Sequence, residues 1–562
     1  MKSTIIVIGG LSAGPSAAAK ARRMNEHAEI ILFEKTKYVS YATCGIPYSM
    51  SGTIKEREKL MVVKPDLLRT RFNIDVRLEE EVTDINPETH EVITSKGTYK
   101  YNKLIFATGA SPFVPPVEGL NETTNWSNCR TIEDLDKIKK DGVLDKRKNI
   151  VVLGAGLIGV EVAENLNEIG KNVTIVEMAP SILSTWDGKF GYMAENVMKE
   201  NGVEVLTNTT VQAIERDGDQ IKYVTLNNGQ KIEADYLLMG IGGRPNTGLL
   251  TSKGAEHLPN GALKVNERME TSLPDIYAAG DCASIKNIQT GQHDYFPMGT
   301  HSNKGGRTAG ANAAGGNETF KGAYKTAIVK VFDYTLGRTG HNARSLKMIG
   351  KEYKTTFFVA PASPGFFPGQ TDLYIEMYYD PNNGVVLGAE IFGLKGVDKR
   401  IDVLSTAIYA RLTIEDLQNL DLAYAPPYSP AKDPVIVSGY ISDNRKKLLL
   451  REFSVDGLET YMREHRAEDY QLIDVRNPKE LENEGQINNA INIPLDTLRE
   501  GLEELDPNKP TIVYCARGLR GYVAATILMN KGFDKLYNLG GGFKGWQVQG
   551  GPVVKTFENK LS

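Results

Sequence analysis

Short apolar runs recur along the chain, and several of them are followed by a segment with helical periodicity. The runs Thr4–Ile8, Asn149–Leu153 and Thr511–Tyr514 are almost continuously apolar, which is typical of strands buried on both faces of a parallel sheet. Further apolar runs at Glu29–Phe33 and Asn172–Val176 follow the first two after one helix each. This alternation of strand and helix predicts an α/β protein with more than one parallel sheet.

Length and composition add that several domains are present. A chain of 562 residues exceeds the usual single-domain size, so we expect three or more cores. A net charge of −4 gives no indication of nucleic acid as a partner. The four cysteines (Cys44, Cys129, Cys282 and Cys515) lack CxxC pairing and metal-ligand spacing, which argues against a disulfide framework and a metal site. With neither a signal peptide nor an 18-residue apolar stretch, we expect a cytoplasmic enzyme without a membrane partner.

The first apolar strand leads into a glycine-rich turn, Gly9-Gly-Leu-Ser-Ala-Gly14. Gly9 permits a tight turn and Gly14 permits close helix packing, so backbone N–H groups would point at a pyrophosphate. Leu11 replaces the usual second glycine, and an ordinary glycine turn is the alternative. Glu34 ends the next strand 20 residues past Gly14, where an acid binds a ribose hydroxyl.

The second turn, Gly154-Ala-Gly156-Leu-Ile-Gly159, matches the dinucleotide fingerprint completely. Glu177 ends the following strand. Its carboxylate would accept hydrogen bonds from a free 2′-hydroxyl and repel a 2′-phosphate, which favours NADH over NADPH while leaving NADPH possible.

Two further segments, Leu104-Ile-Phe-Ala-Thr-Gly109 and Ile276-Tyr-Ala-Ala-Gly-Asp-Cys282, resemble the flavin-fold signatures of the two-dinucleotide disulfide reductase family. The resemblance covers roughly residues 1–445. It implies that the first fold holds FAD, with Asp281 at the flavin ribitol, and that the second holds NAD(H). The expected cofactor-binding residues are Gly9, Gly14, Glu34, Lys35, Thr108, Gly109, Arg130, Asp281, Gly154, Gly156, Ile158, Gly159, Glu177 and Gly242.

Cys44 lies in Ser40-Tyr-Ala-Thr-Cys-Gly-Ile-Pro-Tyr48 and has no second cysteine five residues on, because that position is Ser49. A lone redox cysteine must cycle as a mixed disulfide with an external thiol or as a sulfenic acid. The segment resembles the active site of coenzyme A disulfide reductases, which are related to NADH oxidases and peroxidases that use the sulfenate.

That resemblance implies a set of substrate contacts and a homodimer. The residues from Tyr324 to Tyr440 resemble a dimerisation domain, and phenylalanines at Phe366 and Phe367 replace a family tyrosine, so disulfide reduction is expected to be slow. Tyr424 would face the substrate sulfur as a catalytic residue, although an aromatic bracing a proline turn is the alternative reading. The expected coenzyme contacts are Lys20, Arg23, Ser40, Thr43, which stands where an Asn is familiar, Asn303 and Lys432.

The strand Thr511–Tyr514 leads directly to the loop Cys515-Ala-Arg-Gly-Leu-Arg520, and a helix is expected over 521–530. Loop N–H groups would converge on the Cys515 thiol, and Arg517 and Arg520 add positive charge, which favours a thiolate or a persulfide. Tyrosine phosphatases also hold a cysteine in a loop that ends at an arginine, but their CX5R loop has one more residue between the two than Cys515 and Arg520 have. The shorter loop favours sulfane sulfur over a phosphoryl group as the group that is transferred. The segment resembles a single rhodanese domain, and a non-catalytic docking or sensor module is the alternative.

The resemblances together define an expected domain order. Two Rossmann-type folds are expected, an FAD-binding domain over 1–148 and 245–322 and an NAD(H)-binding domain over 149–244. An α+β dimerisation domain (323–441), a linker (442–451) and a rhodanese-like α/β domain (452–562) would follow. We expect NADH-dependent reduction of coenzyme A persulfide, other persulfides or polysulfides, or coenzyme A disulfide. In this hypothesis Cys515 relays sulfane sulfur and Cys44 carries out the reduction. The alternative is a sulfenate-based NADH oxidase or peroxidase.

Overall fold

The structure is a computed structural model that describes residues 3–449 and 451–555. It divides into two compact units. The first unit contains the chain up to Ser184 and from Met198 to Tyr324, and the second contains Thr185–Val197 and the chain from Lys325 onward. Each unit is described by itself.

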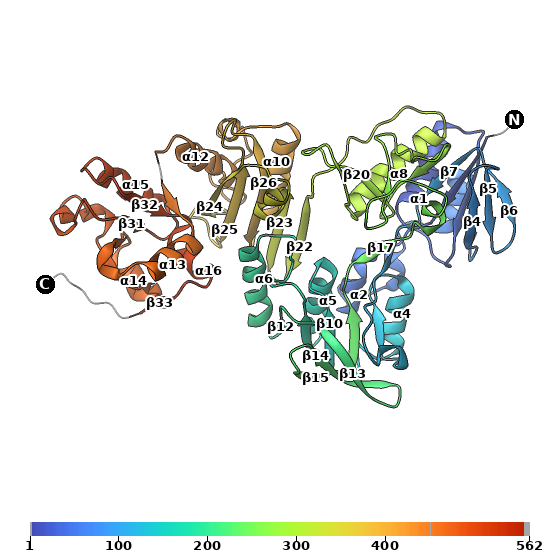
Figure 1. Cartoon of the computed structure of the whole chain (residues 1–562), viewed down its shortest axis with the longest axis horizontal. Coiled ribbons are helices and arrows are strands. Elements are labelled where there is room, and N and C mark those ends of the chain that lie inside the picture. The colour runs from blue at the N-terminus through green and yellow to red at the C-terminus, as the bar shows by residue number, and fades with distance from the viewer. Residues whose placement is uncertain (1–2, 450, 556–562) are drawn as a thin grey trace. The chain divides into compact units, whose positions relative to one another are not determined.

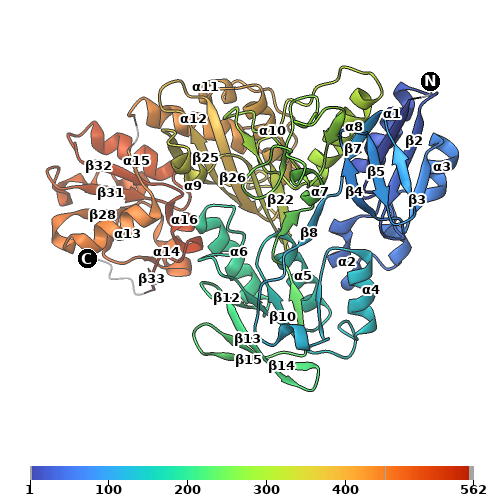
Figure 2. The same ribbon diagram turned by 45° about the vertical axis from the view of Figure 1, so that its right-hand side comes forward.

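The first unit holds two five-stranded parallel sheets. The first sheet has the order β19-β7-β1-β2-β3. Its strands are β1 (Thr4–Ile8), β2 (Glu29–Glu34), β3 (Asp75–Leu78), β7 (Lys103–Phe106) and β19 (Ile276–Ala278). Helices α1 (Ala13–Met24) and α8 (Gly299–Ala313) lie side by side against it (Figures 1 and 2). They pack closely because Gly306 and Gly310 of α8 face the α1 backbone at Ala13 and Ala17, where a Cβ would come within 2.3 and 2.1 Å of carbonyl oxygens.

The second parallel sheet has the order β12-β11-β10-β16-β9. It consists of β9 (Trp126–Asn128), β10 (Asn149–Leu153), β11 (Asn172–Val176), β12 (Glu204–Leu206) and β16 (Tyr236–Met239), with α4 (Ile132–Lys140) and α5 (Leu157–Glu168) beside it. Two antiparallel three-stranded sheets extend the unit: β4 (Val82–Asn86), β5 (Glu91–Thr94) and β6 (Thr98–Lys100), and β13 (Val211–Asp217), β14 (Gln220–Leu226) and β15 (Lys231–Glu233). The strands β1, β10 and β11 have the predicted bounds.

Shorter elements complete the first unit. They are the helices α2 (Ile46–Met50), α3 (Pro65–Phe72) and α7 (Gly248–Thr251), the paired strands β8 (Ala110–Pro112) and β17 (Gly243–Pro245), and β18 (Leu263–Lys264), β20 (Ala283–Lys286) and β21 (His293–Asp294). Helix α6 (Gly188–Glu200) crosses the boundary between the two units.

The second unit begins with a five-stranded antiparallel sheet of order β22-β23-β26-β25-β24. The strands are β22 (Ala327–Val331), β23 (Tyr334–Gly340), β24 (Lys354–Pro361), β25 (Asp372–Tyr379) and β26 (Val386–Gly393). The helices are α9 (Ala343–Met348), α10 (Val397–Tyr409), α11 (Ile414–Leu417) and α12 (Pro434–Lys446). Residues 442–446, placed in a linker by the sequence analysis, form the last turn of α12.

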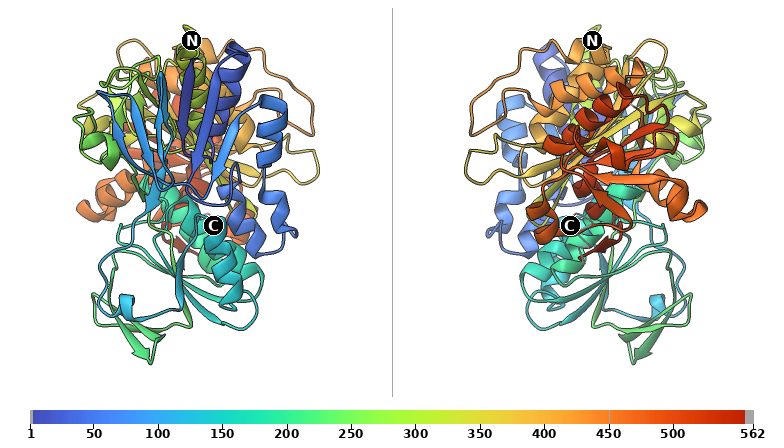
Figure 3. Two further views of the ribbon diagram at one scale, coloured as in Figure 1. Left: turned by 90° about the vertical axis from the view of Figure 1, so that its right-hand side faces the viewer. Right: turned by 90° about the vertical axis from the view of Figure 1, so that its left-hand side faces the viewer.

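A parallel sheet of order β27-β32-β31-β28-β30 follows, and we call residues 451–555 the C-terminal module. Its strands are β27 (Glu452–Phe453), β28 (Gln471–Asp474), β30 (Ala490–Asn492), β31 (Thr511–Tyr514) and β32 (Leu536–Leu539), and β29 (Gln486–Ile487) pairs with β33 (Val553–Val554). Its helices are α13 (Val455–Glu464), α14 (Pro478–Glu484), α15 (Leu519–Met529) and α16 (Gly542–Val548), seen in orange and red in Figure 3.

Alternate residues of β31 enter two separate hydrophobic cores. Val513 and the following Cys515 pack with α15, whereas Ile512 and Tyr514 pack with Leu458 of α13 and with α16. This period of two follows from the strand pleat. Cys515 is therefore fixed at the end of a fully buried strand.

A buried polar cluster lies on the antiparallel sheet. Glu390 of β26 is 1% exposed, and its carboxylate accepts hydrogen bonds from the side chains of Asn342 (3.0 Å) and Tyr378 (3.2 Å). Nearby, Lys189 forms an ion pair with Glu376. Burial raises the pKa of Glu390 to about 7, although Arg338 opposes that rise.

We expect this carboxyl to make the folded state less stable as the pH rises. Because the pKa of Glu390 is higher in the folded state, its protonated form favours folding at low pH, and that contribution is lost as the pH passes through about 7. Between about pH 5.5 and pH 8 the loss should be about 2 kcal/mol. The free energies of unfolding of the wild type and of Glu390→Gln are measured in urea at several pH values. The difference between the two proteins should change by this amount between the two pH limits, and a difference that is constant with pH would contradict the raised pKa of Glu390.

Candidate functional site

The two glycine-rich turns have the backbone geometry that a pyrophosphate requires. Gly9 and Gly154 have φ of 104° and 97°, a region that glycine adopts without strain. A Cβ on Gly14 would lie 1.8 Å from the Gly9 carbonyl oxygen, and one on Gly159 would lie 2.0 Å from that of Gly154. At Gly156 a Cβ would meet open space, so a ligand has room to approach the backbone there. Both turns fit a dinucleotide.

The two acids predicted to bind ribose also hold these turns. Glu34 accepts the N–H groups of Gly10 and Thr36, each at 2.8 Å. Glu177 accepts those of Ala155 and Ala179, each at 2.7 Å. Each carboxylate therefore lies beside its glycine turn, at the carboxyl end of the strand that follows this turn in the chain: β2 for Glu34 and β11 for Glu177.

Other predicted cofactor residues gather near the first sheet. Arg130 forms an ion pair with Asp281 at 2.7 Å, and the Asp281 carboxylate also accepts a hydrogen bond from Ser302 at 3.3 Å. The Thr108 hydroxyl donates to the Asn246 carbonyl at 2.7 Å. Gly109 has a φ of 66°. Three further predicted cofactor residues are exposed: Lys35 after β2 in the first sheet, and Ile158 and Gly242 beside the second sheet.

Cys44 is exposed and lies in a short 3-10 turn, Thr43–Gly45, immediately before α2. Helix α2 is attached to α5, because Tyr48 donates to Glu161 at 3.0 Å and Ser51 donates to Asn165 at 2.6 Å. Ser49 is buried, and its hydroxyl has no hydrogen-bond partner among the described residues. The described part of the chain therefore gives Cys44 no cysteine partner.

Predicted substrate contacts of the first unit lie mainly on α1 and α8. Asn303 accepts a hydrogen bond from Ser16 at 2.6 Å. One turn further along α1, Lys20 is largely buried and forms an ion pair with Glu318 at 2.7 Å. Arg23 is exposed, with its guanidinium over the Phe72 ring. Ser40 has a φ of 47°, and its N–H donates to the Gly10 carbonyl at 2.8 Å, so it borders the first glycine turn.

The predicted substrate residues Tyr424 and Lys432 lie in the second unit, on an exposed loop before α12. The loop ends at Asp433, which is buried, caps α12 and pairs with Arg400 at 3.0 Å. Phe366, between β24 and β25, is 77% exposed. The structure thus leaves these aromatic side chains available for a partner molecule.

Cys515 is almost fully buried, and its sulfur accepts the N–H of Gly518 at 3.1 Å. The helix begins at Leu519 rather than at the predicted residue 521, because Gly518 adopts a φ of 113° and caps it. Arg520 therefore belongs to the first turn of α15. Its guanidinium makes two hydrogen bonds to Glu480, at 2.6 and 2.7 Å, and these bonds together with the nearby Cys515 raise its pKa.

Arg517 points to a different carboxylate. Its guanidinium pairs at 2.8 Å with Asp372 at the start of β25, which also receives Lys544. Sequence analysis missed Glu480 and Asp372, and only Glu480 has a local signal, because it lies three residues after Asn477 and completes a capping box with it. Asp372 has none, since it lies 145 residues from Arg517.

Asp474 and Arg476 form a fully buried ion pair at 2.7 Å. Arg476 also donates to the Gly485 carbonyl at 2.7 Å, and its guanidinium lies 3.8 Å from the Phe543 ring centre. The pair joins α14 to α16 behind the Cys515 loop.

The remaining cysteines, Cys129 and Cys282, are buried. Cys282 donates weakly to the carbonyls of Phe106 and Ala279, and burial raises its pKa to about 11. Burial also raises the pKa of Cys129. Neither thiol is therefore reactive at neutral pH.

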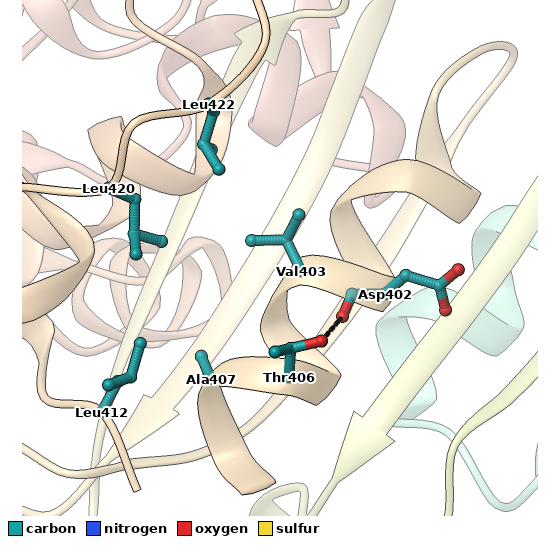
Figure 4. A pocket seen from close by; sticks show the side chains of 7 residues that line it. All are labelled: Asp402, Val403, Thr406, Ala407, Leu412, Leu420 and Leu422. Carbon is teal, nitrogen blue, oxygen red and sulfur yellow. Dashed lines mark hydrogen bonds between the residues drawn. The ribbon is translucent and has the colours of Figure 1, made fainter. Parts of the chain in front are cut away.

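A pocket of about 340 Å³ in the second unit is lined mostly by apolar side chains (Figure 4). It lies between α10 and the following segment and is lined by Asp402, Val403, Thr406, Ala407, Leu412, Leu420 and Leu422. Neither Cys44 nor Cys515 lines it. Among the described residues no cluster of His, Cys, Asp and Glu could hold a metal ion, and no helix there is long and apolar enough to cross a membrane.

The chain belongs to the pyridine nucleotide-disulphide oxidoreductase family. The family model matches residues 3–294, and the model of the family's dimerisation domain matches residues 326–434. A rhodanese-like domain matches residues 458–549. The family uses FAD and NAD(P)H, and the two glycine turns described above fit these cofactors.

Curated relatives match the first four-fifths of the chain. An NAD(P)H coenzyme A polysulfide/persulfide reductase of Pyrococcus horikoshii is 32% identical over 78% of this chain and 98% of its own. A coenzyme A disulfide reductase of Staphylococcus haemolyticus is 31% identical over 78% of this chain and 98% of its own.

Two solved structures resemble the chain over nearly its full length. The reduced CoADR-RHD protein of Bacillus anthracis is 38% identical, with a TM-score of 0.92 and 98% coverage of both chains. An NAD-dependent persulfide reductase from A. fulgidus is 35% identical, with a TM-score of 0.90 over 97% of this chain and all of that one. The similarity therefore includes the C-terminal module.

Proposed function

We propose that this protein is an NADH-dependent flavoenzyme that reduces coenzyme A persulfide or other small persulfides and polysulfides to thiol and sulfide. Coenzyme A disulfide is a possible further substrate. The observation that carries the proposal is the full-length similarity to the two solved proteins, since it extends over both the Cys44 segment and the Cys515 module. A chain that only reduced a disulfide would not need a second thiol in a loop suited to sulfane sulfur.

The proposed sulfur transfer begins at Cys515. Its thiolate attacks the outer sulfur of a persulfide or polysulfide, a new S–S bond forms, and the donor leaves as a thiolate with the electron pair of the broken bond. Coenzyme A thiolate then takes that outer sulfur in the same way. Loop N–H groups, Gly518 among them, and Arg520 stabilise the anionic sulfur.

The proposed reduction takes place at Cys44. Its thiolate attacks the coenzyme A persulfide, the S–S bond breaks, and either hydrosulfide or coenzyme A thiolate leaves while Cys44 keeps the other group. When bound, FAD would supply the electron pair from NADH that breaks the S–S bond on Cys44, so that the retained group leaves as coenzyme A thiolate or hydrosulfide and Cys44 returns to the thiolate. Exposure of Cys44 and the absence of a neighbouring cysteine among the described residues suit an external sulfur substrate.

The finer assignments rest on the resemblance and belong to this proposal. Coenzyme A would contact Lys20, Arg23, Ser40, Thr43, Asn303 and Lys432, and Tyr424 would face the substrate sulfur. The match to the dimerisation domain supports a homodimer, in which the exposed loop of Tyr424 serves the partner subunit. The boundaries given above are the proposed domains, and two reactive thiols suit a reducing, cytoplasmic setting.

Glu177 is expected to make NADH the preferred donor. Its carboxylate lies at the second glycine turn, where a 2′-phosphate would be repelled. We expect kcat/KM for NADH to exceed that for NADPH, and Glu177→Gln to narrow the ratio about tenfold by removing the charge. Equal ratios in wild type and variant would show that Glu177 does not select the nucleotide. Glu34→Gln, the matched change at the first turn, should leave the ratio unchanged.

The test of the proposed function is anaerobic NADH oxidation with quantified sulfide. Coenzyme A persulfide should be turned over faster than coenzyme A disulfide, with one sulfide released per NADH. Faster turnover of the disulfide, which the phenylalanines at Phe366 and Phe367 make unexpected, would instead indicate a disulfide reductase with an accessory module.

A second candidate function is a sulfenate-based NADH oxidase or peroxidase. It is favoured by a relative from Methanocaldococcus jannaschii called an NADH oxidase, which is 32% identical over 79% of this chain. Rapid NADH consumption with oxygen or peroxide as the sole acceptor would support that function over persulfide reduction.

A further inference from the structure

The C-terminal module is attached to the antiparallel sheet of the second unit by a charged contact beside the Cys515 loop. Asp372, the first residue of β25, receives Arg517 at 2.8 Å and also pairs with Lys544 of α16. The Asp372 side chain is only 11% exposed. Burial opposes its ionisation, yet Lys544 and Arg517 hold the pKa of Asp372 below its usual value, so the contact is ionic at neutral pH.

An apolar contact lies next to the ionic one. The Phe357 ring of β24 packs where Gly541 and Gly545 have no side chains. A Cβ on Gly541 would lie 2.6 Å from the ring and one on Gly545 would lie 3.0 Å from it. The attachment therefore depends on shape as well as charge, and removing one charge need not separate the two parts.

The two arginines of the Cys515 loop have different attachments. Arg520 makes both of its carboxylate hydrogen bonds to Glu480, which belongs to the module itself. Arg517 instead pairs with Asp372, outside the module. Arg517, two residues after Cys515, thus holds the module to the antiparallel sheet. Its side chain is 36% exposed, which leaves room for it to turn toward Cys515.

We propose that Asp372 and an anionic sulfur on Cys515 compete for the guanidinium of Arg517, so that loading the module with sulfur loosens its attachment to the antiparallel sheet. Asp372 is then a positioning residue for the Cys515 loop. The inference rests on the proposed sulfur-accepting function of Cys515.

The competition follows from the charges. With thiosulfate as donor, the Cys515 thiolate attacks the sulfane sulfur, a new S–S bond forms on Cys515, and sulfite leaves with the electron pair of the broken bond. The product is a persulfide anion that extends one sulfur atom further into the loop. Arg517 is drawn toward this anion and away from Asp372, while Lys544 stays paired with Asp372. Because the coupling is reciprocal, loosening the attachment favours loading equally.

The first test measures the reactivity of Cys515 without any sulfur donor. The flavin-loaded protein is treated with iodoacetamide at neutral pH, and alkylation of the Cys515 peptide is followed by mass spectrometry. Asp372→Asn should accelerate alkylation about three- to tenfold, because it removes a negative charge and releases Arg517 to the thiolate. In the double variant Asp372→Asn/Arg517→Met the acceleration should be lost.

Control variants separate this effect from a general loosening of the fold. Asp380→Asn removes another carboxylate that follows the same strand and pairs with Lys351, and it should leave the rate unchanged. Lys544→Met keeps Arg517 on Asp372 and should not accelerate alkylation. Phe357→Ala loosens the attachment without removing a charged group, so it should also accelerate alkylation and serves if Asp372→Asn does not fold. Equal acceleration in the double variant, or none in Asp372→Asn and Phe357→Ala, would overturn the proposal.

The second test follows hydrogen exchange of the peptides covering β24 and α16 before and after thiosulfate treatment. Exchange should become faster in the wild type once the Cys515 peptide has gained a sulfur atom, and should not change in Cys515→Ser. Unchanged exchange in a fully loaded protein would refute the coupling. If the peptide gains no sulfur, the sulfur-accepting function itself fails, and the alkylation rates decide separately whether Asp372 controls Arg517.

Discussion

Cys44→Ser is expected to abolish NADH-dependent sulfide release from coenzyme A persulfide, lowering the rate about a thousandfold, while thiosulfate-to-cyanide sulfur transfer stays within about twofold of wild type. The serine hydroxyl cannot form the S–S bond through which the substrate sulfur is held. Cys44 is also exposed and without a cysteine partner in the described chain, so no other thiol nearby replaces it.

The measurement is paired. Sulfide and NADH are followed anaerobically with the persulfide, and thiocyanate is followed with thiosulfate and cyanide on the same preparation. Flavin content, read from the absorption spectrum, controls for loss of cofactor. Sulfide release at the wild-type rate would remove Cys44 from the reaction.

Cys515→Ser should give the opposite pattern. Sulfur transfer from thiosulfate to cyanide should fall about a thousandfold, while reduction of pre-formed coenzyme A persulfide should stay within about twofold of wild type. The reason is that the Cys515 loop supplies the attacking thiolate and the N–H groups that hold its sulfur, and neither is needed once the coenzyme carries the sulfur.

The decisive condition for this variant supplies an inorganic polysulfide with catalytic coenzyme A. The wild type should then sustain NADH oxidation, and Cys515→Ser should not. Equal rates under this condition would mean that coenzyme A takes sulfur directly and that the module is a docking or sensor domain.

Local pattern was sufficient to predict much of the fold. The strands Thr4–Ile8, Asn149–Leu153 and Thr511–Tyr514 have their predicted bounds because each is a buried run that ends at a glycine turn or at the Cys515 loop. The strand that follows each glycine turn was also predicted, because it is an apolar run followed by an acidic residue, Glu34 in the first fold and Glu177 in the second. The start of α15 was misplaced because a cap at Gly518 depends on its φ, which the sequence does not specify.

Contacts between distant segments could not be predicted. Lys20 was expected to contact the coenzyme, and the structure pairs it with Glu318, almost 300 residues along the chain. Arg517 was expected to face Cys515, and the structure pairs it with Asp372. In both cases the cation is recognisable from its own motif, whereas the carboxylate that fixes its direction carries no motif. The roles of these residues toward substrate stay predictions.

The space that Gly541 and Gly545 leave for the Phe357 ring limits which domains could replace the C-terminal module. A homologous domain grafted onto this reductase would carry its catalytic loop intact, but a side chain at either glycine would collide with the ring. Domain exchange would thus have to preserve two small residues outside the Cys515–Arg520 motif. Chimaeras that retain both glycines can be compared with chimaeras that carry alanine at these positions. The comparison would show whether the contact with Phe357 or the Cys515 loop limits the exchange of domains.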